Sequence, residues 1–214
     1  MLLRHSHTSP FVRKVTVMLH ETGFADRVAL ETVDGWAEPE VLTMDNPLSM
    51  VPTLVLEDGS ALYDSGVICD YLDGLHEGPR MIPAGGAERW QVLREQALAD
   101  GVLECAVLIF VELSKRPAEK RWDWWIELKQ RAITRALDGL EAGAAGLTGR
   151  IDLGTLSLAV ALGYLDLRGA VGDWRATRPR LAAWYAGMAD RASMVATAPP
   201  TWGAGVDGDL LAAA

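Results

Sequence analysis

The sequence predicts a small α/β domain followed by an all-helical domain. Residues 1–75 alternate between short strand-like and helix-like stretches. Residues 76–89 are rich in glycine and proline, and beyond them the pattern is helical with few strand signals. At 214 residues the chain is long enough to bury a core in both parts.

The first part begins with a strand, a helix and a second strand. "MLLR" is a short strand, "PFVRKVTVMLHETG" a helix and "RVALETV" another strand. An apolar stripe at helical spacing runs through Phe11, Val15 and Met18, with Val12 and Leu19 beside it. This order predicts a parallel βαβ unit with a right-handed crossover.

A hairpin and a helix complete the first part, after an irregular or short helical piece. "PTLVL" and "ALYD" are strand-like, and Asp58 and Gly59 between them favour a tight turn. Asp64 can cap the following helix. We expect one apolar face on that helix, formed by Val67, Ile68, Tyr71, Leu72 and Leu75. The result is a mixed four-stranded sheet.

The second part contains four longer helical patterns, at 88–115, 122–143, 152–170 and 178–192. The third is apolar on nearly all sides, so we expect it to be central. Trp122, Trp124 and Trp125 crowd the start of the second. Core or interface packing explains them most simply, and a hydrophobic wall for a substrate is the alternative.

Composition and charge limit the partners and the cellular location that we expect for this protein. The net charge of −9 argues against nucleic acid or an anionic membrane as the main partner. The first residues lack the apolar core of a signal peptide, and no segment is apolar enough to span a bilayer, so we expect a soluble cytoplasmic protein. Cys69 and Cys105 are far apart in helix-like stretches, which favours buried thiols over a disulfide or a metal site.

Two adjacent hydroxyls, Thr8 and Ser9, stand before Pro10 at the start of the first helix. Ser before Pro is first of all a helix cap. His5 and His7 lie in the preceding loop, where they can touch a substrate. A Ser-His-Asp hydrolase is disfavoured because the chain has no Gly-x-Ser-x-Gly elbow.

Two further stretches, around Pro52 and around Asp64, can each be explained by a structural role or by ligand binding. Pro52 precedes a strand that should be central, so either a trans proline ends the loop there or a cis Val51–Pro52 bond forms a special turn. A cis turn leaves the backbone of Val51 available to an extended peptide. Asp64 and Ser65 cap a helix, and the same groups suit a ligand that carries both an ammonium and a carboxylate.

The stretches "TSPFVRKV", "NPLSMVPTLVLEDG", "LYDSGVICDYLD", "ALADG" and "GYLDLR" follow one another over nearly the whole chain. Together they resemble a bacterial cytosolic glutathione transferase of the serine type, in the subgroup whose first helix begins Thr-Ser-Pro-Phe-Val-Arg-Lys. The resemblance implies a thioredoxin-like, glutathione-binding domain at 1–77, a linker at 78–88 and an all-helical domain at 89–214 with the electrophile pocket and dimer contacts.

The resemblance also implies roles for single residues. The backbone of Val51 would pair with the cysteinyl part of glutathione, while Asp64 and Ser65 would hold its γ-glutamyl ammonium and carboxylate. Ser9 would donate a hydrogen bond to the glutathione sulfur, with Thr8 as the alternative donor. No cysteine stands at or beside Ser9, which argues against a glutaredoxin-like branch that uses its own thiol.

Phe11, Met50 and Pro52 complete the glutathione-binding set that we expect. Relatives often carry Gly-Lys where this chain has Ser49 and Met50, so the lysine expected near the glycyl carboxylate is absent. Another cation, such as Arg13, is a candidate replacement. We expect no metal site.

The resemblance therefore implies a homodimeric glutathione transferase that adds the thiolate of its co-substrate, glutathione, to a hydrophobic electrophile. A glutathione-dependent peroxidase, dehalogenase or isomerase would use the same thiolate. The non-enzymatic alternative is a transferase-like protein that binds a ligand or partner without turnover. Met50, in place of the expected lysine, is the residue that supports this alternative.

Overall fold

The computed structural model describes residues 1–37 and 39–200, and these form two compact units. The first comprises residues 1–93 together with 192–199, and the second comprises residues 94–191 and 200. The boundary falls inside a helix, α4, which spans Gly86–Ser114. Contacts alone do not define functional domains, so the division at 1–77, 78–88 and 89–214 stays a prediction.

The first unit is built on a mixed four-stranded sheet. Its strands are β1 (Leu2–His5), β2 (Ala29–Thr32), β3 (Thr53–Val55) and β4 (Ala61–Leu62), in the order β2-β1-β3-β4. β1 pairs parallel with β2 and antiparallel with β3, and β3 pairs antiparallel with β4. The predicted βαβ and ββα halves are therefore confirmed.

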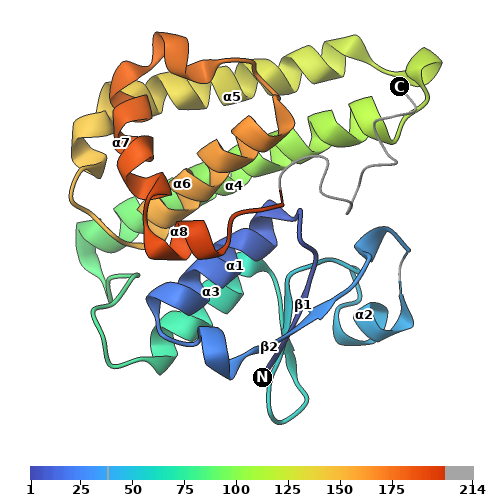
Figure 1. The fold of residues 1–214 in the computed structure, drawn as a ribbon, viewed down its shortest axis with the longest axis vertical. Helices are drawn as coiled ribbons and strands as arrows, with labels where there is room; N and C mark the ends of the chain where they lie inside the picture. Colours follow the sequence, from blue (N-terminus) through green and yellow to red (C-terminus); the bar gives the residue numbers. More distant parts are fainter. Residues whose placement is uncertain (38, 201–214) are drawn as a thin grey trace. The chain divides into compact units, whose positions relative to one another are not determined.

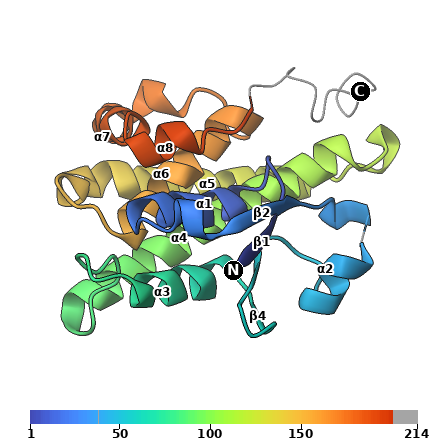
Figure 2. The ribbon, with the colours of Figure 1, turned by 60° about the horizontal axis from the view of Figure 1, so that its bottom comes forward.

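Three helices flank this sheet. α1 (Pro10–Glu21) and α3 (Ser65–Leu75) pack against each other, and α2 (Glu40–Asp45) lies on the other side of the strands (Figures 1 and 2). The guanidinium of Arg4 in β1 bonds Asp45 at the end of α2, with 2.8 Å between Nε and Oδ2. The short helix α2 lies in the segment for which the sequence predicted either irregular structure or a short helix.

The apolar face predicted for α3 is partly wrong. Ile68 and Leu72 are buried as expected, but Val67 and Leu75 are 49% and 40% exposed. The buried stripe instead follows the three- and four-residue spacing of Ser65, Ile68, Cys69 and Leu72. Val67 lies about 100° around the helix from Ile68, at the side of that stripe. Leu75 shares the face of Ile68 and Leu72, but it is the last residue of α3.

A helix from the end of the described chain belongs to the first unit. α8 (Ala192–Ala196) packs beside α1. Arg13 donates from its guanidinium to the carbonyl oxygen of Met194 at 3.1 Å, and the Ser193 hydroxyl donates to Glu21 at 2.5 Å. Arg13 is thus committed at least in part to α8.

The second unit is helical. It contains most of α4, with α5 (Asp123–Gly143), α6 (Leu153–Arg168) and α7 (Pro179–Ala189). Every residue of 153–165 is buried, which confirms that α6 is central. Short 3-10 helices occur in the two units at Ala25–Arg27, Gly35–Ala37, Ala118–Lys120, Ala144–Leu147 and Trp174–Thr177.

The start of α6 is held by a capping box. The Asp152 carboxylate accepts from the Thr155 amide at 2.9 Å, and the Thr155 hydroxyl lies 3.1 Å from the Asp152 amide. Arg150 joins this cap to Glu95 of α4 through two bonds of 2.8 and 2.9 Å. None of the described helices is long and apolar enough to cross a bilayer.

The tryptophans at the start of α5 lie at the surface of the chain. The rings of Trp122 and Trp124 stack with centroids 4.9 Å apart, and these residues are 58% and 51% exposed. The prediction of core packing is therefore wrong for Trp122 and Trp124. Packing at an interface and a hydrophobic wall for a substrate both stay predictions for these residues.

Candidate functional site

Three segments carrying predicted site residues leave the sheet at the same end. The antiparallel pairing places the C-terminal ends of β1 and β4 next to the start of β3. Ser9 follows β1, the Val51–Pro52 bond precedes β3, and Asp64 and Ser65 follow β4. The topology thus brings the three predicted segments to one edge of the sheet.

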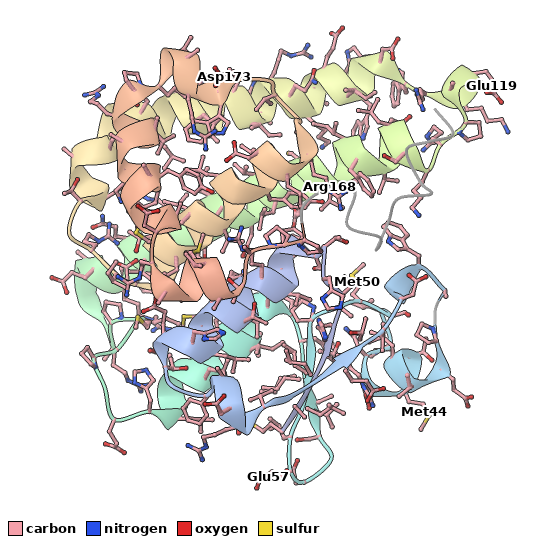
Figure 3. All side chains as sticks on the ribbon, viewed as in Figure 1. Met44, Met50, Glu57, Glu119, Arg168 and Asp173 are labelled. Atoms are coloured by element: carbon pink, nitrogen blue, oxygen red, sulfur yellow. The ribbon has the colours of Figure 1, made fainter. Side chains whose placement is uncertain are left out.

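Figure 3 locates this edge through two labelled side chains. Met50 lies at the start of β3, and Glu57 lies beyond its other end, in the β3–β4 turn. Met50 is 62% exposed, so its side chain is accessible beside the predicted site.

Ser9 caps α1, as predicted. Its backbone is extended, with φ −74° and ψ 122°, and its Oγ accepts from the Val12 amide at 3.3 Å. Pro10 occupies the first helical position. A hydroxyl has one donor and two acceptor sites, so the cap leaves the Ser9 O–H free to donate to a ligand. Thr8, beside it, is half-buried.

The Phe11 amide adds a further donor at this end of α1. It is the second amide position of the helix, where no intrahelical acceptor exists. No partner for it occurs in residues 1–37 and 39–200.

The bond between Val51 and Pro52 is cis, as predicted. The loop before it is held by Asn46, a buried residue that the sequence analysis did not single out. The Asn46 side-chain amide donates to the Met50 carbonyl and to the Thr53 hydroxyl, both at 3.1 Å. Thr53 itself donates to the Met50 carbonyl at 2.8 Å. This network fixes the backbone immediately before Val51.

Ser49 in the same loop has a backbone conformation that favours glycine. Its φ is +51°, in the left-handed region, and its buried Oγ has no hydrogen-bond partner among the residues that the structure describes. The resemblance already indicated glycine at this position in relatives. The loop geometry and the substitution of glycine by serine are therefore in conflict at this residue.

Asp64 and Ser65 begin α3. The Asp64 carboxylate accepts from the Gly66 amide at 3.0 Å, which confirms the cap, and Asp64 is exposed. Ser65 is only 2% exposed. A ligand carboxylate at this point would therefore meet the first amides of α3 and a small accessible part of Ser65.

Two histidines and a threonine meet at the same edge of the sheet. Thr32 Oγ1 lies 3.1 Å from Nε2 of His5 and 3.5 Å from Nε2 of His7. The imidazole rings are 5.0 Å apart, edge to face. Burial lowers the pKa of His5, and the neighbouring His7 lowers it further. The sequence analysis placed both histidines in the loop, which is wrong for His5, the last residue of β1. It gave no sign of Thr32, because only the strand register brings Thr32 there.

Cys69 and Cys105 are not joined in a disulfide, and Cys69 lies one helical turn after Ser65 in α3. Cys69 is buried, whereas Cys105 is half-buried, and burial raises the pKa of its thiol. Within the described part of the chain, no group of three or more His, Cys, Asp or Glu side chains could hold a metal ion.

Comparison with known proteins identifies the family. The family described as "Glutathione S-transferase, N-terminal domain" matches residues 8–75, and "Glutathione S-transferase, C-terminal domain" matches residues 124–187. The chain belongs to the glutathione S-transferase family. Its first unit thus contains the thioredoxin-like domain of this family, and the all-helical domain follows, as predicted.

Relatives of this family member cover almost its whole length. The uncharacterized GST-like protein YibF of Escherichia coli (strain K12) is 33% identical over 207 residues, which is 94% of this chain and 99% of that protein. A glutathione transferase family member from Pseudomonas fluorescens Pf-5 was crystallised with bound glutathione. It is 46% identical and superposes with a TM-score of 0.91 over 94% of this chain and 99% of that one.

A second crystal structure of a Pseudomonas fluorescens Pf-5 family member contains S-(propanoic acid)-glutathione. It is also 46% identical, with a TM-score of 0.87 over 94% of this chain and all of that one. Glutathione is therefore the ligand that similar members of the family hold in crystals, both unmodified and with a substituent on its sulfur.

Proposed function

We propose that this family member binds glutathione at the edge where the segments of Ser9, Val51 and Asp64 meet, and adds its thiolate to a hydrophobic electrophile. The observation that carries the proposal is the convergence of these segments at one end of the sheet. Glutathione in the crystals of a 46% identical relative supports it. We further propose that the chain belongs to the serine-type branch.

The proposed recognition divides glutathione among three segments. The backbone of Val51, outside the paired residues of β3, binds the cysteinyl part. Asp64 accepts from the γ-glutamyl ammonium, and the start of α3 with Ser65 receives the γ-glutamyl carboxylate. Pro52 shapes the turn, and Phe11 contributes its backbone amide beside the sulfur.

Ser9 is proposed to stabilise the thiolate rather than to act as a nucleophile itself. Lowering a thiol pKa from about 8.5 to about 6.5 requires about 2.7 kcal/mol of preferential thiolate stabilisation. A helix N-terminus typically supplies about 0.3–1 kcal/mol, and a hydrogen bond to a charged group about 1.5–3 kcal/mol. The start of α1 and the Ser9 hydroxyl together reach the required size, while neither does so comfortably alone. Thr8 is the alternative donor.

Met50 weakens one part of this site. An exposed methionine offers no charge to the glycyl carboxylate. Arg13, considered as a replacement cation, donates to the Met194 carbonyl. The same bound thiolate would serve a peroxidase, dehalogenase or isomerase, and weak glutathione binding would favour a non-catalytic binding protein.

The proposal includes several features taken from the family resemblance. These are a homodimer, a cytoplasmic location, a role in detoxification, and the division into domains 1–77 and 89–214 around a linker at 78–88. Nucleic acid and membranes are not proposed as partners.

The proposal is tested by glutathione affinity and conjugation. We expect retention on immobilised glutathione and conjugation of a chlorinated dinitrobenzene, with a reduced rate in Ser9→Ala. Thr8→Val is the matched control because it removes the neighbouring hydroxyl. Retention with full activity in Ser9→Ala and loss of activity in Thr8→Val would transfer the role to Thr8. Absence of both retention and turnover would favour the non-catalytic alternative.

A further inference from the structure

The cluster of His5, Thr32 and His7 contains two titratable side chains to which the proposed mechanism gives no role. His5 ends β1 and is 7% exposed, whereas His7 lies in the turn after it and is exposed. His7 stands two residues before Ser9, so their Cα atoms are at most about 7 Å apart. An accessible imidazole therefore lies beside the residue proposed to face the glutathione sulfur.

The cluster fixes the direction of the His7 ring. Its edge-to-face contact with His5 and the approach of its Nε2 to Thr32 Oγ1 hold the ring against the sheet. A protonated imidazole carries N–H donors at both nitrogens. Nδ1 of His7 has no partner in the described parts of the chain, so it can donate to a ligand.

The charged groups of the neighbouring elements are engaged elsewhere. Alternation along the strands places Arg4 and Glu31 on the opposite face from His5 and Thr32, where they pair with each other at 2.5 Å.

Beyond the strands, Asp34 after β2 accepts from the Trp36 amide at 3.0 Å. On α1, which has no acidic residue in its first turn, Arg13 donates to Met194, and the Lys14 ammonium lies 5.9 Å from the centre of the Phe11 ring. Asp64, the cap of α3, accepts from Gly66. None of these contacts involves His7.

We propose that His7 is a specificity-determining residue, which binds the carboxylate of an anionic electrophile as the glutathione thiolate attacks it. This inference rests on the function proposed above. It names a substrate class, that of electrophiles with a carboxylate near the reacting carbon, such as halogenated nitrobenzoates.

The reaction itself is an aromatic substitution. The glutathione sulfur forms a bond to the ring carbon, the carbon–chlorine bond breaks, and chloride leaves with the bonding electron pair. The thiol proton has already passed to solvent. His7 changes only the binding of the carboxylate, to which its ring donates a hydrogen bond.

The test compares a chloronitrobenzoate with the corresponding chloronitrobenzamide, and the measured quantity is the ratio of their kcat/KM values. Thiolate formation affects both reactions equally, so it cancels in the ratio. At one fixed pH we expect the ratio to be about fivefold higher for the wild type than for a variant in which His7 is replaced by glutamine, the size of one partly solvated ion pair.

Three variants complete the test. His7→Gln should give the lower ratio, and His7→Arg should keep the high ratio of the wild type. His20→Gln changes an exposed histidine at the other end of α1 and should behave as the wild type.

Two results would overturn the inference in distinguishable ways. An equal ratio in the wild type and His7→Gln, with both compounds conjugated, would reject the role of His7 and leave the proposed transferase intact. A wild type that conjugates neither compound would reject the transferase function, and the inference with it.

Discussion

Replacing Ser9 by alanine separates the two roles of its hydroxyl. The bond from the Val12 amide to Oγ is 3.3 Å long, and losing such a cap costs about 1 kcal/mol of unfolding free energy. If the O–H also donates to the thiolate, its loss removes about 1.5–3 kcal/mol of thiolate stabilisation. The pKa of the bound glutathione thiol should then rise by about one to two units.

Two measurements read these effects independently. Urea denaturation reports the stability loss, and thiolate absorbance in a pH titration of the glutathione complex reports the thiol pKa. From a starting pKa of about 6.5, the thiolate fraction at that pH falls by about five- to fiftyfold, and conjugation should fall with it and recover at alkaline pH. A lower stability with an unchanged thiol pKa would show that Ser9 is only a cap and would refute the proposed role.

Other residues of the same edge give further predictions. Ser49→Gly should stabilise the chain by about 1 kcal/mol, because glycine tolerates the positive φ and removes a buried unpaired hydroxyl; calorimetry would show a higher Tm, and a lower one would contradict the strain. Asn46→Ala should cost about 2–3 kcal/mol in urea unfolding, since it breaks the bonds that hold the Met50 carbonyl, and an unchanged midpoint would contradict that role. Met50→Lys should tighten glutathione binding about threefold at low salt, an effect that added salt should reduce; equal affinity would place the glycyl carboxylate elsewhere. Burial lowers the pKa of His5 from 6.5, so the unfolded chain takes up more protons as the pH falls below 6.5, and the stability contributed by neutral His5 is lost there. Unfolding of His5→Gln at about pH 7 and about pH 5.5 should show a smaller acid loss than the wild type, and an equal loss would exclude this source.

The sequence predicted the architecture because its hydrophobic periodicity agreed with the residues that typically start or stop helices and strands. Ser9, Asp64 and the hairpin turn at Gly59 all occur where the structure begins or ends an element. The face of α3 was less well predicted, because Val67 is as apolar as Ile68 and only packing decides which one is buried.

The sequence predicted those parts of the candidate site that depend on a short local motif. The caps at Ser9 and Asp64 and the cis bond at Pro52 depend on near neighbours in the sequence. Thr32 contacts two histidines that are 25 and 27 positions away, and such contacts follow from strand register rather than from spacing. The support of the Met50 carbonyl by Asn46 likewise depends on side-chain directions that a sequence does not specify.

The central claim is that glutathione binds where the first helix, the cis turn and the start of α3 meet. Calorimetric titration of the wild type and Ser65→Ala with glutathione tests it most directly. We expect saturable binding by the wild type and binding at least about tenfold weaker in the variant, since a hydrogen bond to a charged group is lost. No saturable binding by the wild type, or equal affinity in both proteins, would contradict the site.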